Sequence, residues 1–168
     1  MPSKGFTLFE LLVTLAIAAI LAALAAPSFN HFLSRQQLRS VTHQLHTSLN
    51  LARQTAIARR LPVLVRNKGD NWSNGWTVFV DADNDGQLDA GEEILLEVAE
   101  LPSSIRMSSN FGHYARYRPN GRSAYVSGAF MAGTWLVCAE SWSGTGHKLV
   151  MSAGGRVRSS PKVGTACG

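Results

Sequence analysis

The sequence has few acidic residues, and nearly all of them lie in one short segment. Residues 1–60 contain one carboxylate, Glu10, against six lysines and arginines, and residues 101–168 contain only Glu140 against eight. Residues 61–100 hold the other nine carboxylates with only two basic residues. Charge that is separated along the chain in this way indicates that different faces contact different partners, and the acid-poor C-terminal segment favours a polyanion.

The sequence also lacks the motifs of the common enzyme classes. It contains no G-x-S-x-G elbow, no P-loop lysine motif and no H-E-x-x-H zinc motif. The glycines of SGTGHK, residues 143–148, lack the strand-loop-helix context of a phosphate cradle. The carboxylates at 81–93 are clustered in a turn and provide no acid/base pair. We therefore expect a protein that is not an enzyme and that needs no cofactor, calcium excepted as discussed below.

The longest apolar run lies at the N-terminus. Residues 6–26 are interrupted by a single charge, Glu10. At about 1.5 Å per residue, a helix of this length is about long enough to cross a hydrocarbon core of roughly 30 Å. A secretory signal peptide would explain the run and the cleavage-like sequence Ala23-Leu24-Ala25, but not Glu10. A plain membrane anchor also leaves Glu10 unexplained, because a carboxylate in a membrane helix costs roughly 2.5–3.5 kcal/mol on insertion scales.

The start of the chain resembles a known processing motif. Lys4-Gly5 followed by Phe6-Thr7-Leu8-Phe9-Glu10 and an apolar run is similar to the cleavage and assembly motif of type IV prepilins and type II secretion pseudopilins. The resemblance implies that a prepilin peptidase cuts after Gly5 and methylates the amino group of Phe6. It also implies that Glu10 pairs with the terminal amine of a neighbouring subunit, which would make its charge tolerable in lipid.

This resemblance implies a division of the chain and a location. We expect a leader peptide at 1–5, a transmembrane or filament-core helix half at 6–27 and a periplasmic globular domain at 28–168. The protein would be a single-pass protein of the bacterial inner membrane, and would then assemble with other pilins or pseudopilins into a pilus or pseudopilus.

Beyond the apolar run the pattern is that of an amphipathic helix. The apolar residues recur mostly at steps of three and four, and they are Phe29, Phe32, Val41, Leu45, Leu49, Ala52 and Ala56. We expect one helix from Phe6 to about Arg60, kinked at Pro27. His43 and His46 are three residues apart but lack nearby Cys, Asp or Glu ligands, so a solvated helix face is favoured over a metal site.

After Leu61 the sequence indicates strands and turns. Short β-branched or aromatic runs are separated by Gly, Asn, Ser and Pro. We predict an α+β protein with the type IV pilin fold, in which a long kinked helix packs on a mostly antiparallel β-domain. The expected core aromatic and aliphatic residues are Trp76, Phe79, Trp135 and Val137, whereas Trp72 and Trp142 lie in polar, Gly-rich sequence and are expected to be partly exposed.

Cys138 and Cys167 are the only cysteines. Export past the membrane, which the N-terminal resemblance implies, would place them in an oxidising compartment where an even pair usually forms a disulfide. Such a bridge would enclose the basic C-terminal residues in a loop of about 30 residues, worth roughly 3–4 kcal/mol in the chain-entropy account. The alternative is a pair of free thiols.

The acidic segment DADNDGQLDAGE, residues 81–92, matches the spacing of a calcium-binding loop. The candidate ligands are Asp81, Asp83, Asp85, Asp89 and Glu92, with the carbonyl of Gln87 and the turn at Gly86. The flanking sequences, however, read as strands rather than the helices of an EF-hand. Asp and Gly residues also form tight turns without metal, so we favour a hairpin and keep calcium as the alternative.

The resemblance extends over most of the chain. The helix end LARQTAIARR, the hairpin around DADNDG, the stretch RYRPNGR and the C-terminal GRVR are similar to the GspH/FimT group of minor pilins and pseudopilins. The ending Gly155-Arg156-Val157-Arg158 resembles the G-R-x-R motif of FimT-type minor pilins that bind DNA in natural transformation. The resemblance implies that Arg156 and Arg158 contact DNA phosphates, and we add Lys162 and Lys148 nearby.

Charge supports the same site. Arginines one residue apart on a strand point the same way if Val157 points inward, which gives two guanidinium groups on one surface. Secondary candidates for DNA binding are Arg116, Arg118 and Arg122 of RYRPNGR, which could instead form a solvated hairpin. Phosphate contacts without base readout are expected, because DNA capture must accept any sequence.

Two functions of different class follow. The first is a minor pilin that binds DNA through its C-terminal basic loop for DNA uptake. The second is a structural minor pilin or pseudopilin, acting in pilus tip initiation or type II secretion, whose basic residues contact neighbouring subunits.

Overall fold

The structure is a computed structural model that describes residues 7–110, 112–139 and 145–163. Within those ranges the side chains of residues 22–31, 145, 162 and 163 lie outside the description. Gly5, Phe6, Trp142 and Cys167 therefore fall outside the described residues, and the predictions made for them stay predictions.

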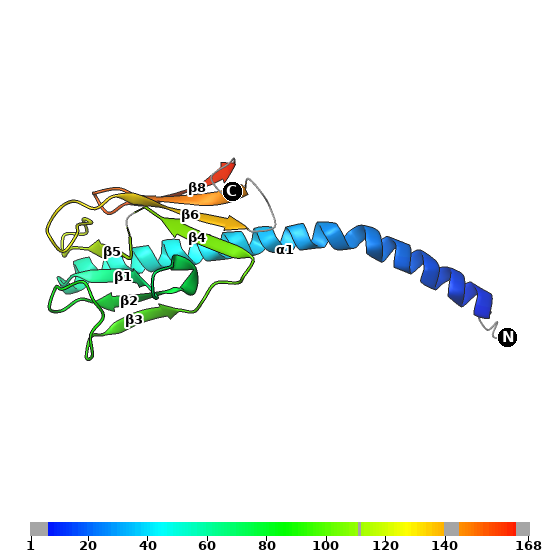
Figure 1. Ribbon diagram of the computed structural model, residues 1–168, viewed down its shortest axis with the longest axis horizontal. Coiled ribbons are helices and arrows are strands. Elements are labelled where there is room, and N and C mark those ends of the chain that lie inside the picture. The colour runs from blue at the N-terminus through cyan, green and yellow to red at the C-terminus, as the bar shows by residue number, and fades with distance from the viewer. Residues whose placement is uncertain (1–6, 111, 140–144, 164–168) are drawn as a thin grey trace.

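A single helix, α1 (Leu8–Arg59), runs through the first third of the chain. Thr7 caps its N-terminus, and Arg60, in the left-handed conformation at φ 56°, ends it. One half packs on the β-domain while the other half projects from it and curves away, as Figure 1 shows. The predicted helix and its end near Arg60 are thus confirmed, and the helix is continuous through Pro27.

In the part of the chain that the structure describes, eight strands form two four-stranded sheets. The strands are β1 (Val63–Asn67), β2 (Trp76–Val80), β3 (Ile94–Val98), β4 (Ile105–Ser109), β5 (Tyr114–Tyr117), β6 (Gly133–Ala139), β7 (Thr145–Met151) and β8 (Val157–Val163). The first sheet has the order β3-β2-β1-β5 and the second β4-β6-β7-β8, with every pairing antiparallel. Both sheets lie against the second half of α1 (Figure 1). The predicted α+β architecture is confirmed.

The core lies between α1 and the two sheets. The helix contributes a buried stripe at steps of three and four, namely Leu38, Val41, Leu45, Leu49, Ala52 and Ala56. The four predicted core residues, Trp76, Phe79, Trp135 and Val137, are fully buried. Phe32, near the start of the predicted stripe, is instead exposed, and it lies six residues before Leu38, the first buried residue that is described in the helix.

The prediction for Trp72 was wrong. This residue begins the short 3₁₀ helix η1 (Trp72–Asn74) and is only 3% exposed. Its ring meets the edge of Trp135 at a centroid distance of 5.5 Å, and its indole nitrogen donates to the carbonyl of Gly112 at 2.9 Å. Its polar local sequence therefore reflects the turn around it rather than exposure of its own side chain.

The apolar helix half carries many exposed large hydrophobic side chains, from Leu8 and Phe9 to Ile20 and Leu21. Across the part of the chain that the structure describes, no helix contains a stretch that is both long and apolar enough to span a membrane. The predicted segment 6–27 includes Phe6 and the side chains of 22–27, which lie outside the description.

Candidate nucleic-acid interface

The two arginines of the G-R-x-R sequence lie at the turn between β7 and β8. The backbone nitrogen of Gly155 donates to the carbonyl of Ser152 at 2.8 Å, and the nitrogen of Ser152 donates to the carbonyl of Arg156 at 3.0 Å. Gly155 has a φ of 76°, which favours glycine. Val157 packs against the core, whereas Arg156 and Arg158 on either side of it are exposed.

Both arginines border a cavity of about 510 Å³ between the helix and this hairpin. Its described lining is Arg53, Val150, Ser152, Gly154, Arg156 and Arg158. Three arginines thus border one space, and none of the described lining residues is acidic. No carboxylate in the described ranges forms an ion pair with Arg156 or Arg158. The cavity therefore offers uncompensated positive charge to an anion.

Arg53 was not predicted from the sequence, yet its hydrogen bonds join the β7–β8 turn to the turn at Gly121. Its Nε donates to the carbonyl of Gly121 at 3.0 Å, and its Nη2 donates to the carbonyl of Gly154 at 3.3 Å. The two turns that it joins also touch each other, because a Cβ added to Gly155 would lie 2.1 Å from the carbonyl oxygen of Gly121. The only sequence signal was a basic residue next to the buried stripe of the helix, at Ala52.

The two lysine candidates lie on the same hairpin. In the register of β7 and β8, Val150 faces Arg158, and Lys148 faces Ser160. Paired residues share a face and alternate residues repeat it, so Lys148 lies on the same face as Arg158. Lys162 pairs with Gly146, and its side chain lies outside the described residues.

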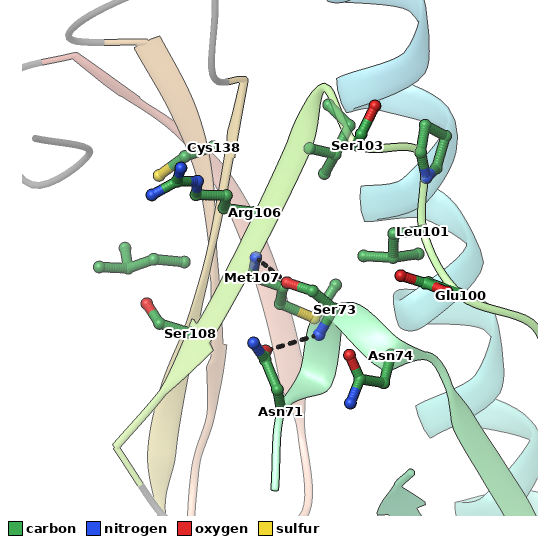
Figure 2. Close-up of a pocket in the computed structure, with 13 residues that line it drawn as sticks. Asn71, Ser73, Asn74, Glu100, Leu101, Ser103, Arg106, Met107, Ser108 and Cys138 are labelled. Atoms are coloured by element: carbon green, nitrogen blue, oxygen red, sulfur yellow. Dashed lines mark hydrogen bonds between the residues drawn. The ribbon is translucent and has the colours of Figure 1, made fainter. Parts of the chain in front are cut away.

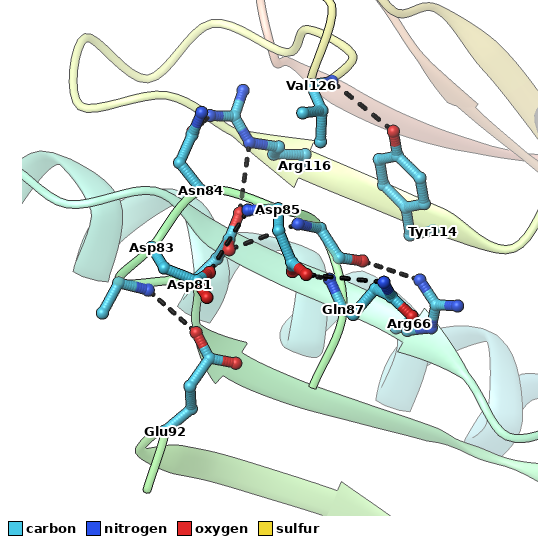
Figure 3. Close-up of polar contacts among 12 residues, drawn as sticks. Arg66, Asp81, Asp83, Asn84, Asp85, Gln87, Glu92, Tyr114, Arg116 and Val126 are labelled. Carbon is cyan, nitrogen blue, oxygen red and sulfur yellow. Dashed lines mark hydrogen bonds and ion pairs between the residues drawn. The ribbon is translucent and has the colours of Figure 1, made fainter. Parts of the chain in front are cut away.

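The three arginines of RYRPNGR are placed differently from one another. Arg118 and Arg122 are exposed and flank a turn in which the nitrogen of Gly121 donates to the carbonyl of Arg118 at 2.8 Å. Arg116 is only 5% exposed. Its Nε lies 3.6 Å from Oδ2 of Asp81, and its Nη2 donates to Asn84 (Figure 3). Arg116 is therefore a buried ion-pair partner, and it does not extend the basic surface.

Asp81, the other partner of this ion pair, is the first residue of the acidic loop that forms the candidate calcium site. Carboxylate oxygens of Asp81, Asp83 and Asp85 lie within 4.8 Å of one another, so the structure brings three of the five acidic candidates together. Asp89 and Glu92 are not in this group. The carboxylate of Glu92 instead accepts from the backbone nitrogens of Ala82 at 2.9 Å and Asp89 at 3.2 Å.

Internal contacts satisfy much of this loop. Asp81 accepts from the nitrogen of Gly86 at 3.3 Å, and Asp85 accepts from the nitrogen of Gln87 at 2.6 Å. Burial raises the pKa of Asp81, while the Gly86 hydrogen bond and the charge of Arg116 oppose this rise. The guanidinium of Arg116 lies beside the buried carboxylate of Asp81, so the chain itself supplies a positive charge to this loop (Figure 3). Whether the loop also binds calcium stays a prediction.

A second cavity, of about 540 Å³, lies beside β4 and η1 (Figure 2). Its lining is mixed, with Glu100 and Arg106 together with amides, hydroxyls and apolar side chains. Two of its polar groups serve the fold, since Asn71 accepts from the nitrogen of Ser73, whose hydroxyl accepts from the nitrogen of Met107. The opposite charges make this cavity a poor match for a polyanion.

Glu10 has a local contact that the sequence reading did not anticipate. Its carboxylate accepts from the backbone nitrogen of Thr7 at 3.4 Å, while the Thr7 hydroxyl accepts from the nitrogen of Glu10 at 3.2 Å. This is a capping box at the start of α1. The predicted pairing of Glu10 with a neighbouring subunit stays a prediction.

The predicted disulfide joins one described and one undescribed residue. Cys138 lies on β6, and it is not a free thiol. Cys167 lies outside the described residues, so the pairing of the two cysteines stays a prediction.

Two protein families match the sequence. Residues 41–155 match the family described as type II transport protein GspH, and residues 1–26 match the prokaryotic N-terminal methylation motif. The first match covers the packed half of α1 and the β-domain as far as Gly155, and the second covers the processing motif and the projecting helix half.

Relatives and solved structures agree with these matches. The type IV major fimbrial protein FimA of Dichelobacter nodosus is 35% identical over 77 residues, which is 44% of this chain and 42% of FimA. The type IV major alpha-pilin of Moraxella bovis is 32% identical over 71 residues, which is 42% of this chain and 45% of that pilin. The chain thus matches less than half the length of these curated relatives.

Among solved structures, the type IV minor pilin FimU of Pseudomonas aeruginosa aligns with a TM-score of 0.62 at 22% identity, over 77% of this chain and 92% of FimU. The minor pseudopilin EpsH of the Vibrio cholerae type 2 secretion system aligns with a TM-score of 0.56 at 12% identity, over 74% of this chain and 96% of EpsH. Both alignments show that the fold is the type IV pilin fold.

Proposed function

Because this chain belongs to the GspH family of minor pilins and pseudopilins, we propose that it is a minor type IV pilin that binds DNA without sequence specificity for uptake in natural transformation. The observation that carries the proposal is the cavity bordered by Arg53, Arg156 and Arg158, in which no described lining residue is acidic. Guanidinium groups bind phosphate oxygens through two parallel hydrogen bonds, so a space between three of them suits a DNA backbone.

The chemistry of the site fits phosphate contacts better than base readout. Arg156 and Arg158 project from a turn at the end of a hairpin, and Lys148 lies on the same face as Arg158. Binding through such charges is independent of sequence and falls steeply as salt concentration rises.

The N-terminal methylation motif supports the route by which the domain reaches a filament. We propose cleavage after Gly5, methylation of Phe6, insertion of 6–27 in the inner membrane with a periplasmic domain from residue 28, and pairing of Glu10 with a neighbouring pilin. A disulfide between Cys138 and Cys167 would hold the C-terminal residues to β6.

The test is DNA binding by the full chain in mild detergent, measured by fluorescence anisotropy with a labelled duplex of arbitrary sequence. We expect binding at low salt that weakens in the double variant Arg156→Gln/Arg158→Gln by about tenfold or more, equivalent to about 1.4 kcal/mol. The matched control is Arg118→Gln/Arg122→Gln, which removes two exposed arginines from the neighbouring turn and is expected to have a smaller effect. Failure of the parent chain to bind at low salt, or full binding by the first variant, would refute the proposal.

A structural minor pilin or pseudopilin without DNA binding is the second candidate. The observation in its favour is the similarity of the fold to both a minor pilin and a minor pseudopilin. In that case Arg156 and Arg158 would contact acidic residues of neighbouring subunits. Loss of filament assembly in Arg156→Gln/Arg158→Gln, with no DNA binding by the parent chain, would support this function instead.

A further inference from the structure

A second basic cavity lies along the same seam between α1 and the β7–β8 hairpin. It has a volume of about 230 Å³ and is lined by Arg39, Thr42, His43, His46, His147 and Ser159. The helix contributes the first four residues, β7 contributes His147 and β8 contributes Ser159. We call this cavity the histidine groove. Every ionisable residue in its described lining is basic, one of them arginine and three of them histidine.

The histidine groove and the arginine cavity share one stripe of the helix. Arg39, His43, His46, Asn50 and Arg53 follow one another at steps of four, three, four and three, which keeps them on one face of α1. At about 1.5 Å per residue, the stripe extends about 21 Å from Arg39 to Arg53. Because duplex DNA rises about 3.4 Å per base pair along its axis, the stripe matches the axial length of about six base pairs.

The groups around His147 make its protonation costly in the absence of an anion. Burial, and then the positive charge of Arg39, lower the pKa of His147. His43 and His46 from α1 and Ser159 from β8 line the same cavity. No described carboxylate lies in this lining to compensate them.

The hydrogen bonds in the groove leave most of its cationic groups available. Thr42 donates its hydroxyl proton to the carbonyl of Leu38 at 2.7 Å, so this residue serves the helix. Nδ1 of His46 lies 3.1 Å from the side-chain amide of Asn50, which leaves Nε2 for another partner. In the described residues, the group that could hold a metal ion is Asp81, Asp83 and Asp85, and none of these lines the groove. The three histidines do not form such a group. The groove therefore suits an anion rather than a metal ion.

We propose that the histidine groove is a second phosphate-binding site on the same DNA track as Arg156 and Arg158, and that it engages phosphate when His147 is protonated. This inference rests on the proposed function, because it assigns to the groove the next phosphates of the DNA held at the arginine cavity. An anion favours the protonated form of the His147 imidazole, so phosphate binding takes up a proton and DNA affinity rises as pH falls.

The test compares DNA affinity of the full chain in mild detergent at about pH 7.5 and about pH 5.5, on either side of the ordinary histidine pKa. The test variant is His43→Gln/His46→Gln/His147→Gln. The matched control is His113→Gln, which removes an exposed histidine near Asp70, in the turn before β5 of the other sheet. We expect the parent and the control to bind about tenfold more tightly at the lower pH, with a steeper dependence on salt, since each added phosphate contact increases the slope of log K against log salt by about 0.7–0.9.

The outcomes separate this inference from the proposed function. Absence of DNA binding by the parent at the higher pH and low salt overturns the proposed function and the groove together. Normal binding at the higher pH, with the same pH response in the triple variant as in the parent, overturns the groove alone. A smaller pH response and an unchanged affinity at the higher pH in the triple variant support it.

Two further measurements guard against a folding artefact and a different partner. Proton uptake on DNA binding, measured by calorimetry in buffers of different ionisation enthalpy, must fall in the triple variant, and the single variant Arg39→Gln must weaken binding at both pH values. Vesicles of anionic phospholipid serve as the competing partner. A triple variant that loses vesicle binding at the lower pH and keeps the full pH response towards DNA would show that the groove binds lipid phosphate, and would overturn the proposal.

Discussion

Arg116 and Arg156 come from similar basic sequences, RYRPNGR and GRVR, yet the fold treats them in opposite ways. Arg116 lies under the acidic β2–β3 loop, where Asp81 and Asn84 surround its guanidinium (Figure 3). Arg156 lies at the β7–β8 turn beside Arg53 and Arg158, with no described acidic residue in the shared cavity. The first arginine offsets negative charge within the fold, and the second leaves positive charge open to a partner.

This difference explains why charge along the sequence is only a partial guide to binding surfaces. The acidic segment 81–92 accounts for much of the negative charge, and its residue Asp81 forms an ion pair with Arg116 of β5. The β7–β8 turn has no such neighbour among the described residues. The comparison predicts that variants of the first region change stability, whereas variants of the second change binding.

The largest expected effect is that of Arg116→Met, which leaves the buried carboxylate of Asp81 without its partner. We expect the free energy of unfolding to fall by about 3 kcal/mol or more at neutral pH, measured by urea denaturation. The matched control is Arg59→Met, which removes the exposed ion pair with Glu93 and is expected to leave stability within experimental error. Equal losses for the two variants would contradict the distinction between a buried and an exposed pair.

The same variant has a pH dependence of fixed sign. Burial raises the pKa of Asp81 and Arg116 opposes this rise, so removing Arg116 raises the pKa further. An acid with a raised pKa in the folded state stabilises the fold below its unfolded pKa and loses that contribution as pH rises through the folded value. The loss of stability in Arg116→Met should therefore be largest at neutral pH and should shrink as pH falls and Asp81 becomes protonated. A loss that stays constant over this range would argue against a charged Asp81.

The second largest effect is expected at the turn that presents the arginines. In Gly155→Ala the new Cβ would lie 2.1 Å from the backbone oxygen of Gly121, at a φ that L-residues rarely adopt. The conformational cost of about 1–2 kcal/mol and an overpacking cost of about 1–3 kcal/mol should lower both stability and DNA affinity. Gly128→Ala is the control, since its φ is also positive but nothing lies within 4 Å of the added atom. Similar losses in both variants would show that the contact between the two turns is unimportant.

How far the sequence predicts this structure depends on the range of the interactions. The helix, the strands and the core positions of Trp76 and Trp135 follow from periodicity and composition, which are local signals. Trp72 was predicted wrongly because its burial depends on a contact with Trp135 on a distant strand. The burial of Arg116 depends likewise on Asp81.

The residues of the candidate site likewise divide into those that local sequence indicates and those that depend on long-range packing. Local sequence indicates that Arg156 and Arg158 lie on one surface, since a partly buried valine separates them. Arg53 was not predicted, because its acceptors lie 68 and 101 residues away along the chain. The histidine groove was also hidden, since His43 and His46 acquire their neighbour His147 only when the β7–β8 hairpin packs on α1. Long-range packing, rather than any motif, brings together the residues of the arginine cavity and the histidine groove.

The third largest effect is expected at Arg53. It tests whether Arg53 positions the β7–β8 turn or only adds charge. Arg53→Met keeps the apolar stem and removes the hydrogen bonds to Gly121 and Gly154, at a cost of about 1–2 kcal/mol in stability. Arg53→Lys keeps the charge but not the planar fork that reaches two carbonyls. We expect both variants to lose similar stability and to weaken DNA binding, with hydrogen exchange at Gly154 and Gly155 increased in both. If the lysine variant retains full affinity and normal exchange, Arg53 acts through charge alone.

The smallest expected effect is that of calcium on the acidic loop. Arg116 already supplies positive charge to Asp81, and both carboxylate oxygens of Glu92 accept backbone hydrogen bonds instead of turning towards the aspartates. A cation would have to compete with the guanidinium and break these bonds, so we expect the melting temperature of the full chain to change by less than about 1 °C in millimolar calcium. Asp83→Asn, which removes one carboxylate of the cluster, should respond in the same way. A rise of several degrees in the parent that disappears in Asp83→Asn would show that the loop binds calcium despite its internal cation, and would remove the distinction between the two arginine regions.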